Sequence, residues 1–200
     1  MRIRNIFHRS KKEIKLPTVV MLNGMYGKLK PKSDFIERQH KRGKLAAKVA
    51  RNIAEQLRDR GRKVNVELAQ KMAFAQGALK HFAEGDAIAA QKALAKQGYA
   101  QLARGIGAMR RGIIPKSVWR MSLEEKILAY ADYACRGVSD ADGIYVHKVY
   151  SIDDAYEIAK KAHDEKIHPF IEQKYKALKI IEQELVKLGF DTRKLQGIRI

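Results

Sequence analysis

The clearest helical signal in the chain lies in Val64-Asn-Val-Glu-Leu-Ala-Gln-Lys-Met-Ala-Phe-Ala-Gln76-Gly77-Ala-Leu-Lys80. Alanine is the best helix former, and the apolar residues of this stretch recur at the spacing of one helix face. That face consists of Ala69, Met72, Ala73 and Leu79. Gln76 lies on the same face, so the stretch predicts a buried helix with a polar amide directed toward the core.

Further helices are expected on both sides of this stretch. Asp34 and Glu37 form a capping-box-like start for a helix that ends near Gly61. Ser122 and Glu125 form a capping box for another. The remaining expected elements are helices at 87–95, from residue 100, at 151–167 and at 169–189, a glycine-weakened region at 105–115, and a loop or short hairpin at 137–150. Strict apolar–polar alternation is nearly absent, so the sequence predicts an all-α helical bundle.

Composition limits the class of protein. With 200 residues, 46% hydrophobic residues and only four prolines, the chain is long and apolar enough to form a core of its own. Its single cysteine, Cys135, excludes an intramolecular disulfide, which fits a reducing compartment such as the cytoplasm. No apolar run approaches the roughly 20 residues that span a bilayer, so we expect no membrane partner.

The charge of the chain indicates the chemistry of its partner. Lys and Arg total 41 against 22 Asp and Glu, which gives a formal net charge of +19. Residues 1–51 contain 15 basic and 3 acidic side chains, so they hold 12 of the 19 net charges. Polyanions gain affinity for such a surface by releasing counterions. Residues 1–12 also resemble an organelle-import peptide, although we interpret them as a basic arm.

We expect this surface to bind nucleic acid, with RNA preferred, through phosphate contacts that leave base identity unread. Candidate contacts in the arm and the turn-rich segment after it are Arg2, Arg4, Arg9, Lys11, Lys12, Lys28, Lys30 and Lys32. Further candidates are Arg38, Lys41, Arg42 and Lys48 on the first long helix, and Arg110 and Arg111. Few aromatic residues accompany the arm, so base stacking is not expected there. A structural role in a ribonucleoprotein particle fits such an arm.

Residues 34–163 resemble the HD-domain phosphohydrolases, in which helices supply a His, a His-Asp doublet and a later Asp to a divalent metal. The helix at Val64–Lys80 resembles the doublet helix, but Gln76 and Gly77 stand where the doublet would be. His40 resembles the first histidine, His81 resembles a histidine often found after the doublet, and Asp132 resembles the last acid.

The resemblance implies a degenerate HD-like bundle without a cofactor. A neutral amide and a glycine cannot replace an imidazole and a carboxylate as metal ligands, so we predict no catalytic residues and no metal. His40, Gln76 and Asp132 are expected to hydrogen-bond one another instead, since buried polar groups are usually paired. The expected division is a basic arm and entering segment at 1–33, an HD-like domain at 34–167 and a C-terminal helix with a tail at 168–200.

Two other functions compete with this interpretation. The first is a metal-dependent phosphohydrolase that acts on nucleotides and holds a divalent metal with atypical ligands. Those ligands would be His40, His81, Asp132 and an acid such as Glu84 or Asp86. The second is a protein-binding adaptor, in which the positive charge serves solubility alone.

Overall fold

The computed structural model describes residues 15–27, 33–79, 84–110, 112–139, 145–195 and 198, and these form an all-α helical bundle with one small hairpin. The α-helices are α1 (Val19–Gly27), α2 (Ser33–Asp59), α3 (Val66–Leu79), α4 (Glu84–Lys96), α5 (Ala100–Arg110), α6 (Leu123–Ala134), α7 (Ile152–Lys161) and α8 (His168–Lys187). The 3-10 segments are η1 (Pro115–Arg120), η2 (Glu165–Ile167) and η3 (Thr192–Leu195). The predicted all-α class is confirmed. In the described part of the chain, no helix combines the length and apolarity needed to cross a bilayer.

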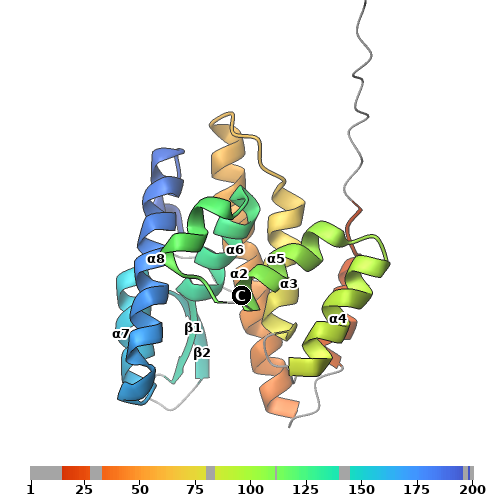
Figure 1. Cartoon of the computed structure of the whole chain (residues 1–200), viewed down its shortest axis with the longest axis horizontal. Coiled ribbons are helices and arrows are strands. Elements are labelled where there is room, and N and C mark those ends of the chain that lie inside the picture. Colours follow the sequence, from red (N-terminus) through yellow and green to blue (C-terminus); the bar gives the residue numbers. More distant parts are fainter. Residues whose placement is uncertain are drawn as a thin grey trace, which may run out of the picture.

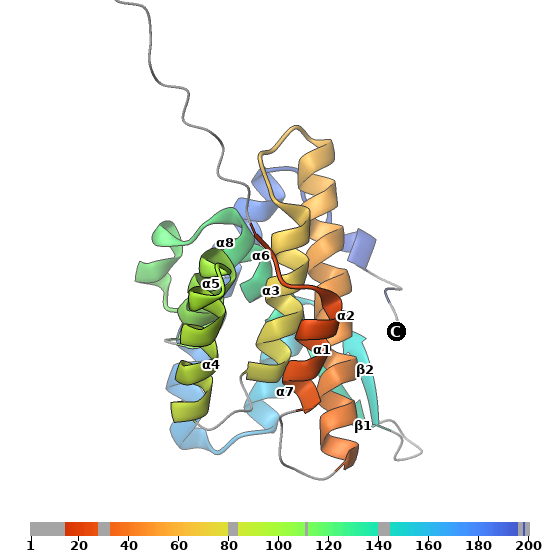
Figure 2. The ribbon, with the colours of Figure 1, turned by 90° about the vertical axis from the view of Figure 1, so that its right-hand side faces the viewer.

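The long helix α2 and the helix α3 form the centre of the molecule. They run side by side, and α1 packs against both of them (Figure 2). Gly61, with φ of 76°, ends the turn after α2 and lets the chain reverse into α3. Small residues on α2, among them Ala50 and Ala54, are fully buried, so the helix axes can approach closely. This pairing fixes the orientation of every cation on α2.

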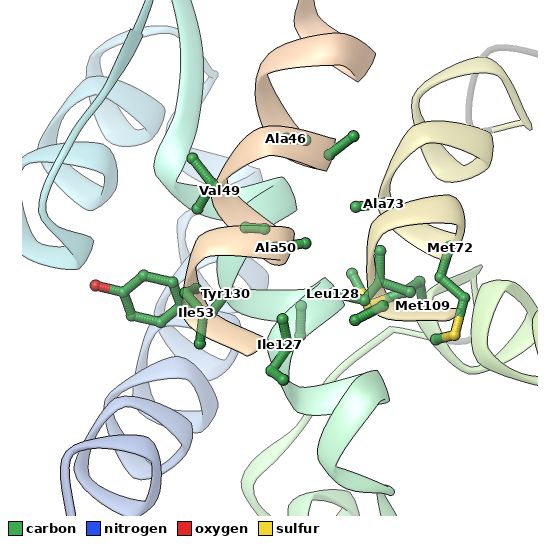
Figure 3. Close-up of a cluster of buried hydrophobic side chains, with 14 of the residues drawn as sticks. Ala46, Val49, Ala50, Ile53, Met72, Ala73, Met109, Ile127, Leu128 and Tyr130 are labelled. Atoms are coloured by element: carbon green, nitrogen blue, oxygen red, sulfur yellow. The ribbon is translucent and has the colours of Figure 1, made fainter. Parts of the chain in front are cut away.

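Helix α6 lies across this pair and completes the core. The predicted capping box is confirmed, because Ser122 Oγ accepts from the Glu125 amide at 3.2 Å and Glu125 Oε2 accepts from the Ser122 amide at 2.8 Å. Ile127, Leu128 and Tyr130 of α6 meet apolar side chains of α2 and α3 (Figure 3). The apolar stripe predicted for α3 is buried as expected, and Gln76 is buried with it.

The hairpin and the last two long helices form the other side of the molecule (Figure 1). Strand β1 (Cys135–Ser139) continues directly from α6 and pairs antiparallel with β2 (Tyr145–Val149), with Gly137 opposite His147. Ser151 caps α7 by accepting from the Asp154 amide at 3.0 Å. Helix α8 contributes Leu178 and Ile181 to the same buried core as α2 and α6.

Two segments differ from the sequence-based expectation. Helix α5 runs through Gly105 and Gly107 without a break. A Cβ at these two positions would lie 2.1 Å from Met72 Cε and 2.0 Å from Gln91 Nε2, respectively. These glycines therefore permit close packing and do not break the helix. Helix α7 ends at Lys161, several residues before the expected end. There Asp164 accepts from the Lys166 amide at 2.9 Å and starts the separate turn η2.

Candidate nucleic-acid interface

A buried ion pair joins α2 to α6 at the position of the predicted last acid. Arg42 Nη2 lies 2.9 Å from Asp132 Oδ1, and the two residues are 7% and 5% exposed. The same guanidinium donates to two backbone carbonyls, those of Asp132 at 2.5 Å and Cys135 at 3.1 Å. The carbonyls at the end of α6 are thereby satisfied together with the carboxylate, which is the condition for burying charge.

This arrangement corrects the predicted position of Arg42. The sequence pattern predicts Arg42 as a phosphate contact on the first long helix, whereas the structure buries its side chain. The reason is helical geometry, because Arg42 precedes Leu45 by three residues and Val49 by seven, and both of these are fully buried. Arg42 therefore shares their core-facing side of α2 and is not available on the surface.

Two more cations surround Asp132. Arg136 and Lys174 lie over the ring of the buried Tyr133, at 4.4 Å and 5.3 Å from its centroid. Burial lowers the pKa of Lys174, Asp132 opposes this change, and the positive charges of Arg136 and Arg42 lower the pKa further. Asp132 therefore lies among three basic side chains, and the local field is already positive.

Cys135 lies beside this cluster as a free, fully buried thiol. Burial raises the pKa of the thiol to about 12, and the positive charge of Arg42 only partly opposes this shift. Because the thiolate is the reactive form, the side chain is a core residue and not a nucleophile.

His40, which resembles the first histidine of the HD-domain site, contacts residues of α1 and α3. His40 Nε2 donates to Asn23 Oδ1 at 3.0 Å, and its ring lies 5.6 Å from that of Phe74. Burial lowers the pKa of His40, and the charge of Lys44 lowers it further. Gln76 is buried, and in the described part of the chain its side-chain oxygen has no hydrogen-bond partner. That oxygen therefore does not join the polar triad expected from the sequence.

These residues do not fit a divalent metal. Gly77 has no side chain, Gln76 offers a neutral amide, and the Asp132 carboxylate is engaged by Arg42. A metal ion at Asp132 would also face the repulsion of neighbouring cations at low dielectric. Among the residues that the structure describes, no three His, Cys, Asp or Glu side chains gather as a metal-binding group. His81 and the side chains of Glu84 and Asp86 lie outside the described residues.

The exposed side of α2 carries a continuous row of positive charge. Its members follow each other at intervals of three, four and three residues, so they share one face of the helix. They are Lys41, Lys44, Lys48 and Arg51, and all four are exposed. We call this set the α2 cationic row.

The α2 cationic row forms one wall of a pocket of about 920 Å³ between α1, α2 and α3. Lys71 of α3 adds a fifth cation, and Glu67 is the single acid among the lining residues. The remainder of the wall is largely apolar, with Leu22 of α1 and Phe74 of α3. The pocket thus combines positive charge at the surface with an apolar and aromatic floor.

Neighbouring acids pair with the two ends of the row. Lys41 pairs with Glu37 at 2.6 Å and Arg51 with Glu55 at 2.8 Å, both at one-turn spacing. Exposed pairs of this kind contribute little energy, so a phosphate can replace the carboxylate. Within the described residues, Lys44 forms no ion pair, and it lies between these two pairs along the helix.

The remaining predicted contacts divide into two groups. Arg38 is exposed, and its guanidinium lies over the ring of Tyr145 at 4.7 Å, on the hairpin side of α2. The predicted contacts that lie outside the described residues are Arg2, Arg4, Arg9, Lys11, Lys12, Lys28, Lys30, Lys32 and Arg111, together with the side chain of Arg110. Lys41 and Lys48 are the two predicted contacts that the structure brings together in the pocket.

Lys44, Arg51 and Lys71 belong to this site but are not among the contacts predicted from the sequence. The interval pattern from Lys41 to Arg51 carries the signal for the first two, because it repeats the periodicity of a helix. Lys71 joins the group only through the packing of α3 on α2, which no pattern within a single segment reveals.

Fold and site together define an all-α bundle with a buried guanidinium–carboxylate pair and a basic, apolar-floored pocket. Comparisons with protein-family models, with curated proteins and with solved structures find no match to this chain.

Proposed function

We propose that this chain is a non-catalytic helical domain, HD-like in its ancestry, that binds nucleic acid through phosphate contacts. The α2 cationic row is the observation that carries the proposal. Four cations spaced along about ten residues of helix cover roughly 15 Å, which is long enough to contact several successive phosphates of an extended strand. RNA is the ligand we expect, bound within a ribonucleoprotein particle.

The absence of catalysis in this proposal is supported by the Arg42–Asp132 pair. In a metallohydrolase the carboxylate holds a cation that lowers the pKa of a bound water. Here a guanidinium of fixed charge holds the same carboxylate, and it brings no exchangeable water. We infer that Arg42 has taken over the electrostatic role of a metal and has converted a reactive centre into a structural joint between α2 and α6.

A charge-matched pair of double variants tests the nucleic-acid proposal. Lys44→Gln with Lys48→Gln removes two charges from the centre of the row. Lys92→Gln with Lys96→Gln removes two charges from exposed lysines with the same spacing on α4. Both variants change the net charge equally, so a difference between them reports a local contact.

Binding is measured by fluorescence anisotropy of a labelled single-stranded RNA and of a DNA with the same sequence. The proposal predicts that the α2 variant loses affinity for RNA and that the α4 variant remains close to the unmodified protein. Equal affinities for all three proteins would contradict a role for the row. Equal affinity for the RNA and the DNA would contradict the RNA preference alone.

A further inference from the structure

A second cationic surface lies at the turn between α5 and α6, and it contains an exposed indole ring. Trp119 in η1 is 69% exposed, whereas the preceding Val118 is 1% exposed. The buried Val118 side chain fixes the turn against the core. Because the backbone of the turn is already ordered, holding the neighbouring ring in solvent costs little further conformational entropy. In Figure 2 the green segment after α5 lies at the left of the molecule and α2 at the right, so this surface is separate from the α2 cationic row.

Arg120 covers part of this ring. Its guanidinium carbon lies 4.6 Å from the centroid of Trp119, which is the geometry of a cation–π contact. Because the guanidinium lies over one face, the ring area open to solvent is largely on the opposite face and the edges. A planar ring with a charged group on one side and an open face on the other is suited to stack a second planar group.

Arg120 also lines a pocket that contains further positive charge. A pocket of about 400 Å³ between α5, η1 and α6 is lined by Arg104 and Arg120, with Ser117 and the acid Glu125. Glu125 is largely buried and already engaged, because it pairs with Arg104 at 3.1 Å and accepts from the Ser122 amide. Lys116 on the same turn is exposed. Arg120 therefore contacts Trp119 directly, Lys116 lies on the same turn, and Arg104 lies in the pocket that Arg120 also lines, where the one acid is occupied.

We propose that Trp119 stacks an unpaired base of a single-stranded nucleic acid while Arg104, Lys116 and Arg120 contact the adjoining phosphates. This inference rests on the proposed function and adds a class of ligand to it. Stacking on an aromatic side chain needs a base whose face is free, which a duplex does not offer. A polyanion without bases satisfies the charges but leaves the ring in water.

The sequence offers an intrinsic probe for this contact, because Trp119 is the only tryptophan of the chain. Tryptophan fluorescence of the full-length protein is recorded during titration with an unstructured oligouridylate or oligoadenylate. Inorganic polyphosphate and polyglutamate serve as polyanions without bases. Stacking predicts that the oligonucleotides quench Trp119 fluorescence over the same concentration range in which anisotropy detects binding. The two control polyanions should change this fluorescence much less.

Substitution at the ring tests the same contact by affinity. Trp119→Ala should bind single-stranded RNA roughly 5- to 150-fold more weakly, as expected for the loss of one stacked base. Trp119→Phe should retain part of the affinity, because it keeps an aromatic face. Phe170→Ala is the matched control, since Phe170 is 72% exposed on α8 and should not affect binding.

The outcomes separate this inference from the proposed function. Anisotropy that detects RNA binding without a change in Trp119 fluorescence, and with full affinity in Trp119→Ala, overturns the stacking site and leaves the proposed function in place. No binding of any oligonucleotide overturns both. Equal quenching by polyphosphate, or a spectrum that shifts with protein concentration alone, overturns stacking in favour of a charge effect or self-association.

Discussion

Arg42 and Asp132 are separated by 90 residues in the chain, yet they form an ion pair of 2.9 Å between two helices of the core. The pair fixes α2, which carries the cationic row, against α6, which starts from the capping box at Ser122. The structural joint and the proposed binding surface therefore lie on opposite sides of the same helix. The predictions below test these two sides separately.

The first prediction concerns the free energy of unfolding that is lost when the Arg42–Asp132 ion pair is broken. Arg42→Met or Asp132→Leu alone should lower the free energy of unfolding by about 3–5 kcal/mol, because each removes one partner of a buried ion pair and leaves the charge of the other without it. The double variant should be closer to the unmodified protein than the sum of the two losses, because neither charge remains. Urea unfolding followed by circular dichroism measures all three. Additive losses would contradict a direct coupling between the two side chains.

The second prediction concerns metal. Protein purified without chelator should contain no stoichiometric Mn, Fe, Ni or Mg, and EDTA should leave its melting temperature unchanged. A bound ion stabilises the folded state by mass action, so its removal from a real site would lower that temperature. Phosphatase turnover that depends on a stoichiometric metal would instead support the phosphohydrolase alternative.

The third prediction concerns pH. Burial lowers the pKa of His147, and the nearby charge of Arg42 lowers it further. A hydrogen bond with the backbone of Arg38 opposes this shift, and the charges of Lys41 and Arg38 add smaller contributions that lower the pKa. The folded state then binds this proton less readily than the unfolded chain does. Stability is therefore full above the ordinary histidine pKa of about 6.5 and is lost as pH falls below it.

His147→Gln should reduce this acid-side loss between about pH 6.5 and pH 5, a window above most carboxylate titration. Thermal melting across that range measures the effect. His163→Gln is the control, because His163 is exposed at the surface. His40 should contribute with the same sign, since burial lowers its pKa as well. A His147→Gln variant with the full pH dependence would contradict this assignment.

The fourth prediction compares two glycines of α5. Gly105→Ala should destabilise by about 1–3 kcal/mol, because the new methyl group would overlap Met72, which is 1% exposed and cannot move away freely. Gly107→Ala meets only the partly exposed Gln91, whose side chain can rotate outward after losing its 2.8 Å bond to the Ala103 carbonyl. That loss is about 0.5–1.5 kcal/mol, and the gain in helix propensity of about 1 kcal/mol offsets it. Equal melting temperatures for the two variants would contradict this difference.

Much of the fold could be predicted from local sequence signals. The capping residue Ser122 and the helix-ending Gly61 act within a few residues of themselves, and the structure confirms both. The packing of Gly105 inside a continuous helix could not be predicted in this way. Its role depends on Met72 of another helix, so a residue that weakens an isolated helix permits contact in the folded one.

The candidate site was harder to predict for the same reason. Lys41 and Arg42 are adjacent and both basic, yet one lies in solvent and the other in the core. Arg42 shares the buried face of Leu45 and Val49, and the carboxylate that neutralises it there comes from Asp132, 90 residues away. Lys71 enters the pocket through the packing of α3 against α2. Trp119 belongs to no periodic pattern, and its exposure follows from the anchoring of Val118 beside it.

The most direct test of the central claim is the salt dependence of RNA binding by the unmodified protein. Each phosphate contact to a single strand contributes about −0.7 to the slope of log K against log salt. Four contacts from the α2 cationic row therefore predict a slope of about −3 or steeper between 50 and 200 mM salt, and Lys44→Gln with Lys48→Gln should reduce its magnitude by about 1.4. An affinity that stays flat over this range, or a slope that the double variant leaves unchanged, would contradict phosphate binding by α2.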